Sequence, residues 1–244
     1  MQGLPRALAF AVLTVLAGAG AKAKATQLDV VEMFTSQACG SCPPADRLLG
    51  DLAQRDGILA LSYSVDYWDY LDWEDTLGRP EFTKRQRAYA KRRGDRSIYT
   101  PQAVANGRFH TAGSDTGAVE AALAKSRRSS DGEQVGLSAR QGMPGSMEIE
   151  VGAAPDGLTM PAGTIWLVEY ADRRIVKIEG GENAGKTVTY HNVVRRLEPV
   201  ARWEGEPISM TVALSQFEDR RAAVLLQEGT EKKAGGIIAA VALP

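Results

Sequence analysis

The sequence is poor in cysteine, and it lacks internal repeats, low-complexity stretches and long apolar runs. Its 244 residues include two cysteines, which are separated by only two residues. A small secreted scaffold stapled by disulfides would carry several pairs spread along the chain, so this class is excluded. After residue 25, no segment reaches the ~18 consecutive apolar residues of a spanning helix. We therefore expect no membrane span.

Neither sign of charge predominates. The chain has 29 Lys and Arg residues against 30 Asp and Glu residues, for a net charge of −1. Removal of the first 25 residues would take away three cations and no acid, which leaves −4. A protein with this net charge does not attract a polyanion electrostatically, so we expect no nucleic-acid partner. The basic residues between Lys84 and Arg93 alternate with apolar ones and indicate a solvated helix face.

The N-terminus has the order of a secretory signal peptide. Arg6 precedes an apolar run over 7–17, and small residues follow as far as Ala25. This order predicts a signal peptide over 1–25 with cleavage after Ala25, and Ala23 offers an alternative site. We expect a periplasmic or secreted protein of about 219 residues, which is enough for one large domain or two small ones.

Both cysteines lie in one motif, Cys39-Gly40-Ser41-Cys42, between an apolar strand pattern and a helix pattern. Unpaired N–H groups and the dipole at a helix start favour a thiolate, which is the nucleophile of disulfide exchange. The second cysteine is close enough to resolve a mixed disulfide. A purely structural role is the weaker interpretation, because so short a disulfide loop constrains little of the unfolded chain.

The first half of the mature chain alternates strand and helix patterns. We expect strands over 27–35 and 58–65, helices over 43–55, 80–93 and 115–128, and a hairpin over 100–109 that turns at Asn106-Gly107. This order predicts an α/β thioredoxin-like domain over residues 26–130, with a mixed sheet and flanking helices. Thr100-Pro101 falls where that fold has a cis-proline beside the cysteine pair.

The second half changes to short alternating segments separated by turns. The expected strands lie at 135–137, 147–151, 165–170, 175–178, 187–190, 208–212, 224–226 and 237–241. The polar, Gly-bearing residues 127–132 are typical of a linker. The pattern therefore predicts a second domain over residues 131–244, which is all-β and sandwich-like.

Several motifs together resemble a known family. They are Val31-Glu32-Met33-Phe34-Thr35-Ser36-Gln37, Cys39-x-x-Cys42-Pro43-Pro44-Ala45-Asp46, Val65-Asp66-Tyr67-Trp68-Asp69-Tyr70-Leu71, Gln86-Arg87-Ala88-Tyr89, Tyr99-Thr100-Pro101-Gln102, Gly181-Glu182-Asn183 and Asn192-Val193-Val194-Arg195. With these motifs the chain resembles the exported bacterial proteins called domain-of-unknown-function family 1223, within the thioredoxin-like superfamily. The resemblance covers most of the mature chain and implies a fold rather than a reaction.

The cysteine segment departs from that of ordinary thioredoxins. Ala38 stands where they carry a tryptophan before the first cysteine, and Ser41 replaces the proline between the cysteines. Pro43-Pro44 follows the pair, and two consecutive prolines fit only the first turn of a helix. We therefore expect the regular helix to begin near Cys42. Cys39 should then lie in the preceding loop, more exposed and with less stabilisation of its thiolate.

Other candidate site residues are expected around the pair. The residue before a thioredoxin-type cis-proline presents its backbone to a bound peptide, so Thr100 and Pro101 are candidate substrate-binding residues. The alternative for Pro101 is a simple loop proline. Tyr67 and Trp68 belong to an aromatic and acidic segment over 66–75 and are expected to form a peptide-binding lip near the cysteines.

Glu32 interrupts an otherwise apolar strand one step from the cysteines. A buried carboxylate there would have a raised pKa and could shuttle the proton of the resolving thiol. Alternatively, Glu32 lies at an edge or pairs with an arginine. Both interpretations are open at this point.

Two metal hypotheses also arise. Asp66, Asp69, Asp72 and Asp75 recur every third residue, a spacing that would suit a hard cation. The interleaved aromatic residues favour a packed loop instead. Cys39, Cys42 and His110 would suit Cu(I) if His110, which follows the hairpin, came close.

The sequence thus favours a thiol-disulfide oxidoreductase that acts on protein or peptide partners, with Cys39 attacking, Cys42 resolving, and no cofactor. A non-enzymatic binding module with a structural disulfide is the main alternative, and a Cu(I)-handling protein is the third. The favoured hypothesis expects both sulfurs to be open to solvent beside Thr100-Pro101.

Overall fold

The computed structural model describes residues 28–129 and 135–243. Its elements are β1 (Asp29–Thr35), α1 (Pro43–Ala53), β2 (Ile58–Ser64), α2 (Pro80–Arg93), β3 (Gln102–Ala105), β4 (Phe109–Ala112), α3 (Thr116–Ser129), β5 (Leu137–Gln141), β6 (Ser146–Val151), β7 (Gly163–Lys177), η1 (Gly181–Asn183), β8 (Thr187–Trp203), β9 (Ile208–Ala213), β10 (Arg220–Thr230) and β11 (Lys233–Leu243). The predicted signal peptide and much of the predicted linker lie outside the described residues. Among the helices described, none is long and apolar enough to cross a membrane.

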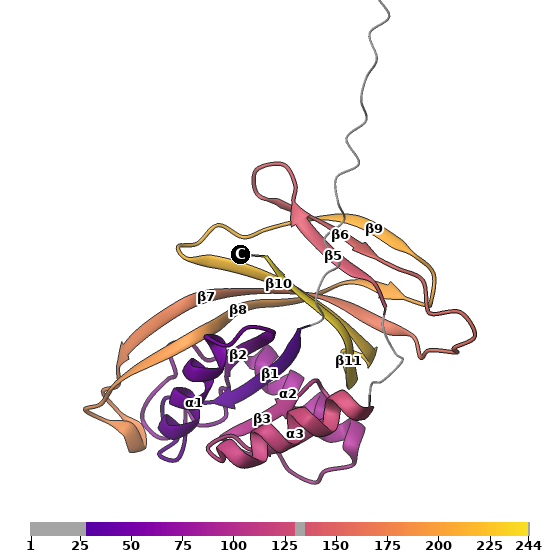
Figure 1. Cartoon of the computed structure of the whole chain (residues 1–244). Coiled ribbons are helices and arrows are strands. Elements are labelled where there is room, and N and C mark those ends of the chain that lie inside the picture. Colours follow the sequence, from indigo (N-terminus) through magenta and orange to yellow (C-terminus); the bar gives the residue numbers. More distant parts are fainter. Residues whose placement is uncertain (1–27, 130–134, 244) are drawn as a thin grey trace, which may run out of the picture.

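A mixed sheet of eight strands runs through the molecule in the order β11-β10-β7-β8-β2-β1-β3-β4 (Figure 1). Within the first half, β1 pairs in parallel with β2 and antiparallel with β3, and β3 pairs antiparallel with β4. This is the predicted thioredoxin-like arrangement of strands and helices. Helix α2 has the predicted bounds, and the ends of α1 and α3 shift by at most two residues.

The second half does not form a sheet system of its own. Strands β7, β8, β10 and β11 continue the sheet of the first half, whereas β5, β6 and β9 form a separate three-stranded sheet. This small sheet packs on the large one around Met147, Ile165 and Trp203. Sandwich-like packing is therefore present, but one of the two sheets is shared with the thioredoxin-like half.

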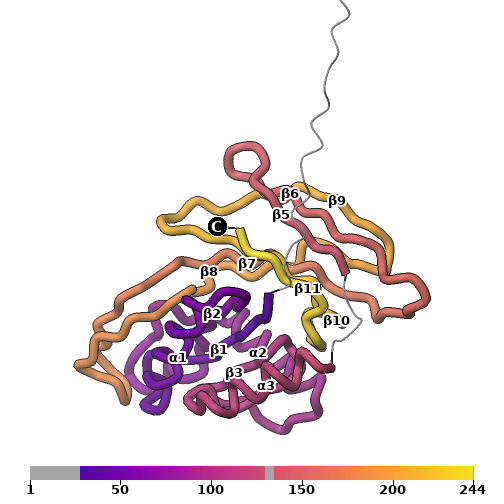
Figure 2. The backbone as a smooth tube through the Cα atoms, in the orientation of Figure 1, coloured from indigo at the N-terminus to yellow at the C-terminus, as the bar shows by residue number. Residues whose placement is uncertain are grey.

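Strands β7 and β8 are much longer than predicted. β7 continues through the polar residues Asp172-Arg173-Arg174, where the sequence pattern had suggested a break between two strands. There the strand leaves the main core and pairs only with β8, so Asp172 and Arg173 are exposed while Val176 packs on a small cluster with Leu77 and Tyr190. Figures 1 and 2 show this hairpin reaching past the core until its tip lies beside α1.

A narrow junction joins the two parts of the large sheet. β2 and β8 pair in parallel at Ser62 and Val193 alone. Next to this pair, Asn192 has a φ of 44°, and its side-chain amide donates to the carbonyl oxygen of Ala60 at 2.8 Å. Asparagine tolerates the left-handed conformation better than most residues, so Asn192 can both turn the backbone and bond β2.

Helices cover both faces of the first-half sheet. On one face, α2 packs with Val30 and Phe34 in a core that continues to Leu225 of β10. On the other face, α1 and α3 pack with Val31 and Met33. Because successive side chains of a strand point to opposite faces, Glu32 lies on the α2 face, away from α1.

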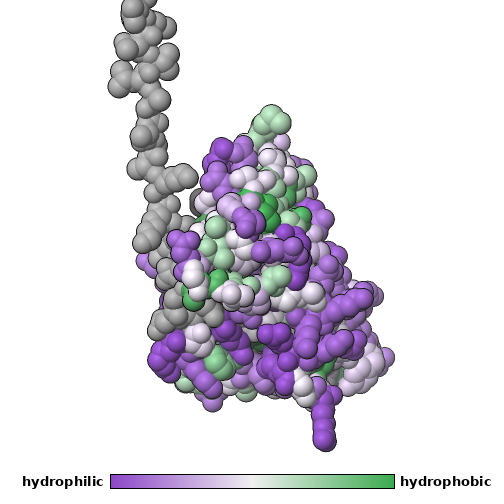
Figure 3. All heavy atoms as spheres, turned by 90° about the vertical axis from the view of Figure 1, so that its right-hand side faces the viewer, coloured by the Kyte–Doolittle hydropathy of each residue, from purple (hydrophilic) through white to green (hydrophobic). Residues whose placement is uncertain are grey.

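The surface offers few large apolar side chains. On the face drawn in Figure 3, hydrophilic residues cover most of the lower part, and hydrophobic residues form separate spots above it. The exposed large apolar residues of the described chain are Tyr70, Tyr99, Met143, Leu158 and Ile175. Two of these, Tyr70 and Tyr99, belong to the segments around Thr100-Pro101, so the exposed aromatic rings are concentrated near the candidate site.

The turn between β3 and β4 docks the first half onto β11. The carbonyl oxygen of Asn106 accepts a hydrogen bond from the N–H of Ile237 at 2.8 Å. The next residue, Gly107, has a φ of 65°, and a Cβ there would lie 2.4 Å from the carbonyl oxygen of Gly235. This turn therefore needs glycine for two reasons, its conformation and the closeness of another backbone.

We predict that Gly107→Ala lowers the free energy of unfolding by about 3 kcal/mol or more, because left-handed strain of about 1–2 kcal/mol adds to a clash with backbone. Gly94→Ala is the matched control, since Gly94 has a φ of 83° but nothing within 4 Å of an added Cβ. Urea unfolding of both variants measures the difference. Equal losses would contradict the docking contact.

Candidate functional site

The loop of residues 36–42 carries both cysteines from β1 to α1. Cys39 and Cys42 form a disulfide. Cys42 is the N-cap residue of α1, and proline occupies the first helical position, where no intrahelical N–H bond is lost. The prediction that the regular helix begins near Cys42 is confirmed. We call residues 36–42 the cysteine loop.

The prediction that Cys39 is more exposed is wrong, because both cysteines are fully buried. The tip of the β7–β8 hairpin, residues 180–185, lies on the cysteine loop; we call it the cover turn. Its Asn183 is buried, and the side-chain amide donates to the carbonyl oxygens of Gln37 at 2.9 Å and Cys39 at 2.7 Å. The carbonyl of Cys39 also accepts from the N–H of Cys42 at 3.1 Å, so the amide adds a second donor there and a donor to Gln37.

Glu182 adds two more contacts between the cover turn and the cysteine loop. Its carboxylate accepts a hydrogen bond from the N–H of Gly40 at 2.8 Å, and its own N–H donates to the carbonyl oxygen of Ala38 at 3.2 Å. Gly181 has a φ of 68°, and a Cβ there would lie 2.9 Å from the Cβ of Ala38. The Gly181-Glu182-Asn183 motif is therefore built to fit against this loop.

The peptide bond Thr100-Pro101 is cis, as the thioredoxin fold predicts. β3 pairs antiparallel with β1, with Gln102 opposite Phe34. Continuing this register by one residue places Pro101 opposite Thr35, the last residue of β1 before the cysteine loop. The proline and the cysteine loop therefore share one end of the sheet.

The segment of residues 66–76 contacts both of these features. The indole N–H of Trp68 donates to the hydroxyl of Thr100 at 2.8 Å. Further along, the indole N–H of Trp73 donates to the side-chain oxygen of Gln37, also at 2.8 Å. The segment thus spans from the cis-proline to the cysteine loop.

Three aromatic rings form the outer part of this lip. Trp68 stacks on Tyr70 with 6.3 Å between ring centroids, and the tilted ring of Tyr67 lies 6.4 Å from that of Trp68. Tyr70 is 73% exposed, so its ring presents an open apolar face to solvent. Burial raises the pKa of Tyr67 to about 12, so its hydroxyl stays protonated at neutral pH. The binding role of these residues stays a prediction.

The aspartates of this segment bond within the protein. Asp66 accepts from the hydroxyl of Thr83, Asp69 from the N–H of Asp75 at 3.2 Å, and Asp75 from the N–H groups of Gln37 and Leu77 at 2.7 and 2.9 Å. These contacts support the packed-loop interpretation. No group of three or more His, Cys, Asp or Glu side chains that could hold a metal ion occurs among the described residues.

Glu32 pairs with an arginine, which favours the second of its two interpretations over a role as a proton shuttle. Its carboxylate accepts from the Nε of Arg85 at 2.5 Å and from the hydroxyl of Tyr89, and all three side chains are buried. Although burial alone would lower the pKa of Arg85, the adjacent Glu32 raises it, so Arg85 is charged. The cysteine helix α1 packs on the other face of the sheet, opposite to the face of Glu32.

His110 is not brought to the cysteines as a third ligand for copper. It lies on β4, where the Nδ1 atom is 3.0 Å from the hydroxyl of Tyr99 and 3.1 Å from the side-chain nitrogen of Gln102. Burial and the charge of Arg93 lower its pKa. The cysteines themselves are bonded to each other.

Comparison with known proteins places the chain in a family. The model of the family described as "Protein of unknown function (DUF1223)" matches residues 30–227. The chain belongs to this family. A comparison with curated proteins found no match.

Two solved structures resemble this DUF1223 protein. The crystal structure of protein AGR_C_4864 from Agrobacterium tumefaciens is 32% identical, with a TM-score of 0.76 over 91% of this chain and 96% of that one. HBP35 of Porphyromonas gingivalis is 14% identical, with a TM-score of 0.61 over 89% of this chain and 74% of that one. The second likeness is one of fold alone.

A carboxyl group missed in the sequence lies on the cysteine side of the sheet. Asp46 of the DUF1223 protein is buried in the first turn of α1, and its N–H donates to the carbonyl oxygen of Cys42 at 3.1 Å. One carboxyl oxygen accepts from the hydroxyl of Thr35 at 2.7 Å, and the other has no partner among the described residues. Burial raises the pKa of Asp46 to about 7.

Asp75 is a second buried carboxyl group at the same end. Burial raises its pKa to about 6, and its charge in turn raises the pKa of Asp46. Asp75 is held by backbone N–H groups, whereas Asp46 has a single hydroxyl partner, so Asp46 is the one that titrates near neutral pH. Its spacing of four residues from Cys42, which places both on one helix face, is the sequence signal that could have identified it.

We predict that Asp46→Asn stabilises the protein at alkaline pH. The folded wild type holds a proton on Asp46 up to about pH 7, whereas the unfolded chain releases it near 3.8, so wild-type stability falls across this window as pH rises. Asparagine mimics the neutral carboxyl. The variant should match wild type near pH 3.5 and exceed it at pH 8 by up to roughly 4 kcal/mol.

The measurement is the free energy of unfolding in urea at several pH values. Asp51→Asn is the control, because Asp51 is an exposed carboxylate on the same helix. A wild-type advantage at pH 8, or the same pH profile for both variants, would show that Asp46 is not a strained buried acid.

Proposed function

We propose that this DUF1223 protein is an exported thiol-disulfide oxidoreductase that exchanges disulfides with protein or peptide partners through Cys39 and Cys42. The observation that carries the proposal is the Cys-x-x-Cys disulfide at the start of a helix, at the same sheet end as a cis Thr100-Pro101. The predicted signal peptide supports an oxidising location, where such a pair can cycle.

The exchange proceeds in two steps. In the reduced protein, the Cys39 thiolate attacks one sulfur of a partner disulfide, and the other partner sulfur leaves as a thiolate. Cys42 then gives up its proton and attacks the Cys39 sulfur, which re-forms the Cys39–Cys42 bond and releases the second partner thiolate. Two electrons pass from the cysteine pair to the partner. The reverse sequence oxidises a partner dithiol.

Asp46 replaces Glu32 as the acceptor of the Cys42 proton. It lies one helical turn after Cys42, and helical side chains lean toward the N-terminus, so its carboxyl group is directed toward that turn. A pKa of about 7 leaves a substantial fraction of Asp46 ionised at neutral pH and able to take up a proton.

The partner would bind across the cis-proline and the aromatic lip. Thr100, beside the cis-proline, offers its backbone at the sheet end, and Trp68, which bonds the Thr100 side chain, joins it to Tyr67 and the exposed Tyr70. An extended peptide would pair with the backbone and lay an apolar side chain on the rings.

Exchange requires the cover turn to move, because neither sulfur is accessible in the closed state. Four hydrogen bonds hold the turn on the cysteine loop. At roughly 0.5–1.5 kcal/mol each, opening costs on the order of 2–6 kcal/mol. An open form at that cost is a minor but accessible state, so we propose that the cover turn gates the disulfide.

A non-enzymatic binding module is the second candidate, and the burial of both cysteines favours it. In that case the disulfide serves to hold the loop on which the cover turn rests. The two candidates differ in what Cys39 does once Cys42 is removed.

We predict that Cys42→Ala captures a peptide disulfide as a stable mixed disulfide, because Cys39 can attack but nothing resolves the product. Mass spectrometry of the protein after incubation with an oxidised cystine-bridged peptide measures the adduct. Cys39→Ala is the control and should form far less adduct. If Cys42→Ala forms none, and Cys39 alkylates no faster than free cysteine, the enzyme proposal fails and the binding module stands.

We predict that Asn183→Ala speeds reduction of the Cys39–Cys42 disulfide by dithiothreitol by about tenfold or more, since it removes two hydrogen bonds of the cover turn. Lys177→Ala is the control, because Lys177 is an exposed residue on the same hairpin. Timed alkylation of the released thiols measures the rate, below the melting temperature of each variant. Unchanged rates would mean that the cover turn does not gate the disulfide.

A further inference from the structure

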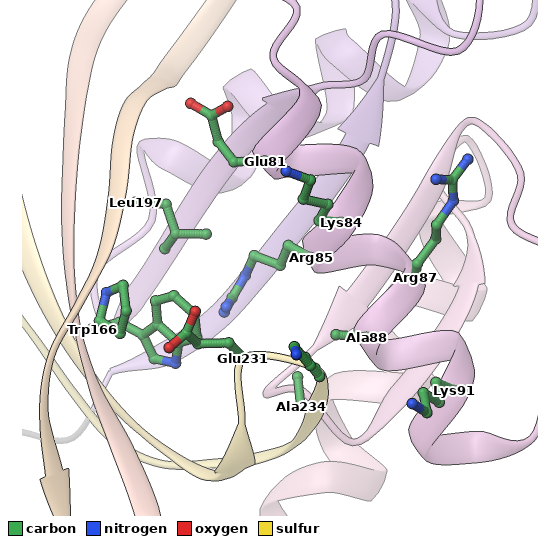
Figure 4. Close-up of a pocket in the computed structure, with 12 residues that line it drawn as sticks. Glu81, Lys84, Arg85, Arg87, Ala88, Lys91, Trp166, Leu197, Glu231 and Ala234 are labelled. Atoms are coloured by element: carbon green, nitrogen blue, oxygen red, sulfur yellow. The ribbon is translucent and has the colours of Figure 1, made fainter.

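A cavity of about 440 Å³ lies between α2 and the second-half strands of the large sheet (Figure 4). Its lining residues are Glu81, Lys84, Arg85, Arg87, Ala88 and Lys91 of α2, Trp166 of β7, Leu197 and Pro199 of β8, and Glu231, Lys232 and Ala234 around the β10–β11 turn. α2 lies on the face opposite α1, so this cavity is separate from the cysteine site. Its volume is typical of sites for small molecules.

The inner wall of the cavity is apolar. Trp166 is 6% exposed and gives the cavity a flat aromatic surface, while Leu197, Ala88 and Ala234 add aliphatic surface around it. Figure 4 shows Trp166 and Leu197 on one side of the cavity and α2 on the other. A ligand with a flat or branched hydrocarbon body would gain contacts on both sides.

Arg85 provides a polar group at the base of this wall. Its Nε and Nη2 atoms bond Glu32 and Tyr89, at 2.5 and 3.2 Å. The remaining nitrogen, Nη1, is buried and has no hydrogen-bond partner among the described residues. The guanidinium carbon lies 5.1 Å from the centre of the Trp166 ring, and Figure 4 shows the side chain extending from α2 toward that ring.

Such an unused donor is rare, because buried polar groups nearly always have partners. The edge of the guanidinium that faces Glu32 is fully used, so Nη1 is turned away from that carboxylate. An acceptor atom from a ligand in the cavity would complete its hydrogen bonding, and a charged acceptor would do so best.

The charges around the cavity favour an anion. Glu32 already balances Arg85. Of the other lining residues, Lys84, Arg87, Lys91 and Lys232 are cations, and only Glu81 and Glu231 are acids. The excess of positive charge raises the local concentration of anions and disfavours amines.

We propose that this cavity binds a small amphipathic monocarboxylate, with the carboxylate at Nη1 of Arg85 and the hydrocarbon body between Trp166 and Leu197. The site is independent of disulfide exchange and would exist whichever function the cysteine pair has.

The test is calorimetric titration of the full-length protein with three probes, benzoate, naphthalene-2-carboxylate and octanoate. At least one should bind saturably with a Kd below about 1 mM. The neutral isostere of the best probe, its carboxamide, should bind at least about tenfold more weakly, because it lacks the charge that Arg85 selects. No saturable binding, or equal binding of acid and amide, overturns the proposal.

Variants locate the binding. Leu197→Trp places a larger side chain in the cavity from its partly exposed edge and should abolish binding. Near-ultraviolet circular dichroism shows whether this variant keeps the fold. Should it fail to fold, the double variant Lys84→Glu/Lys232→Glu alters only exposed side chains and should weaken binding at least about fivefold. Arg96→Glu, a charge reversal at an exposed residue outside the cavity lining, should change it less than about twofold. If Arg96→Glu loses binding, or if the cavity variants keep wild-type binding, the probe binds elsewhere and the proposal is overturned.

Discussion

The hydrogen bonds from the Asn183 amide to the cysteine loop fix the state of the whole site. The loop lies where β1 ends and α1 begins, and one side chain donates two hydrogen bonds to its carbonyl groups. Since Asn183 sits at the tip of a long hairpin, the cysteine loop is held by a segment more than a hundred residues away in sequence. The thioredoxin-like half therefore cannot be understood without the strands that follow it.

Two buried carboxyl groups near β1 show how partners decide the role of a residue. Glu32 faces α2, where Arg85 and Tyr89 hold its charge, and Gln227 of β10 extends the network by donating to Tyr89 at 2.8 Å. Asp46 faces the cysteine side with one hydroxyl partner. The first carboxylate ties two parts of the fold together, while the second is left free to exchange a proton.

Much of the fold could be predicted because its signals are local. The helix over 80–93 has its proline at the start and a glycine at the end, and the two cysteines and two prolines mark the start of α1 within six residues. The cis-proline followed from recognising the order of elements. These features depend on neighbouring residues, which the sequence displays directly.

What the sequence did not predict depends on distant contacts. Nothing local distinguishes Asn183 from an ordinary turn asparagine, yet its partners lie 144 and 146 residues earlier. The polar residues in the middle of β7 suggested a loop, because the pattern cannot tell an exposed hairpin from a break. The burial of Asp46 likewise depends on distant segments, among them those of Asp75 and Tyr190, which lie close enough to interact with it electrostatically.

The shared sheet has a consequence for any attempt to divide the chain. β2 is flanked by β1 on one side and by β8 on the other, and its residues are almost all buried. A fragment that stops after α3 would keep the cysteines and the cis-proline but expose β2 as an unprotected apolar edge, the kind that recruits other chains into intermolecular sheets. Recombinant work on the cysteine chemistry should therefore keep both halves of the chain, since a shortened version would report on aggregation.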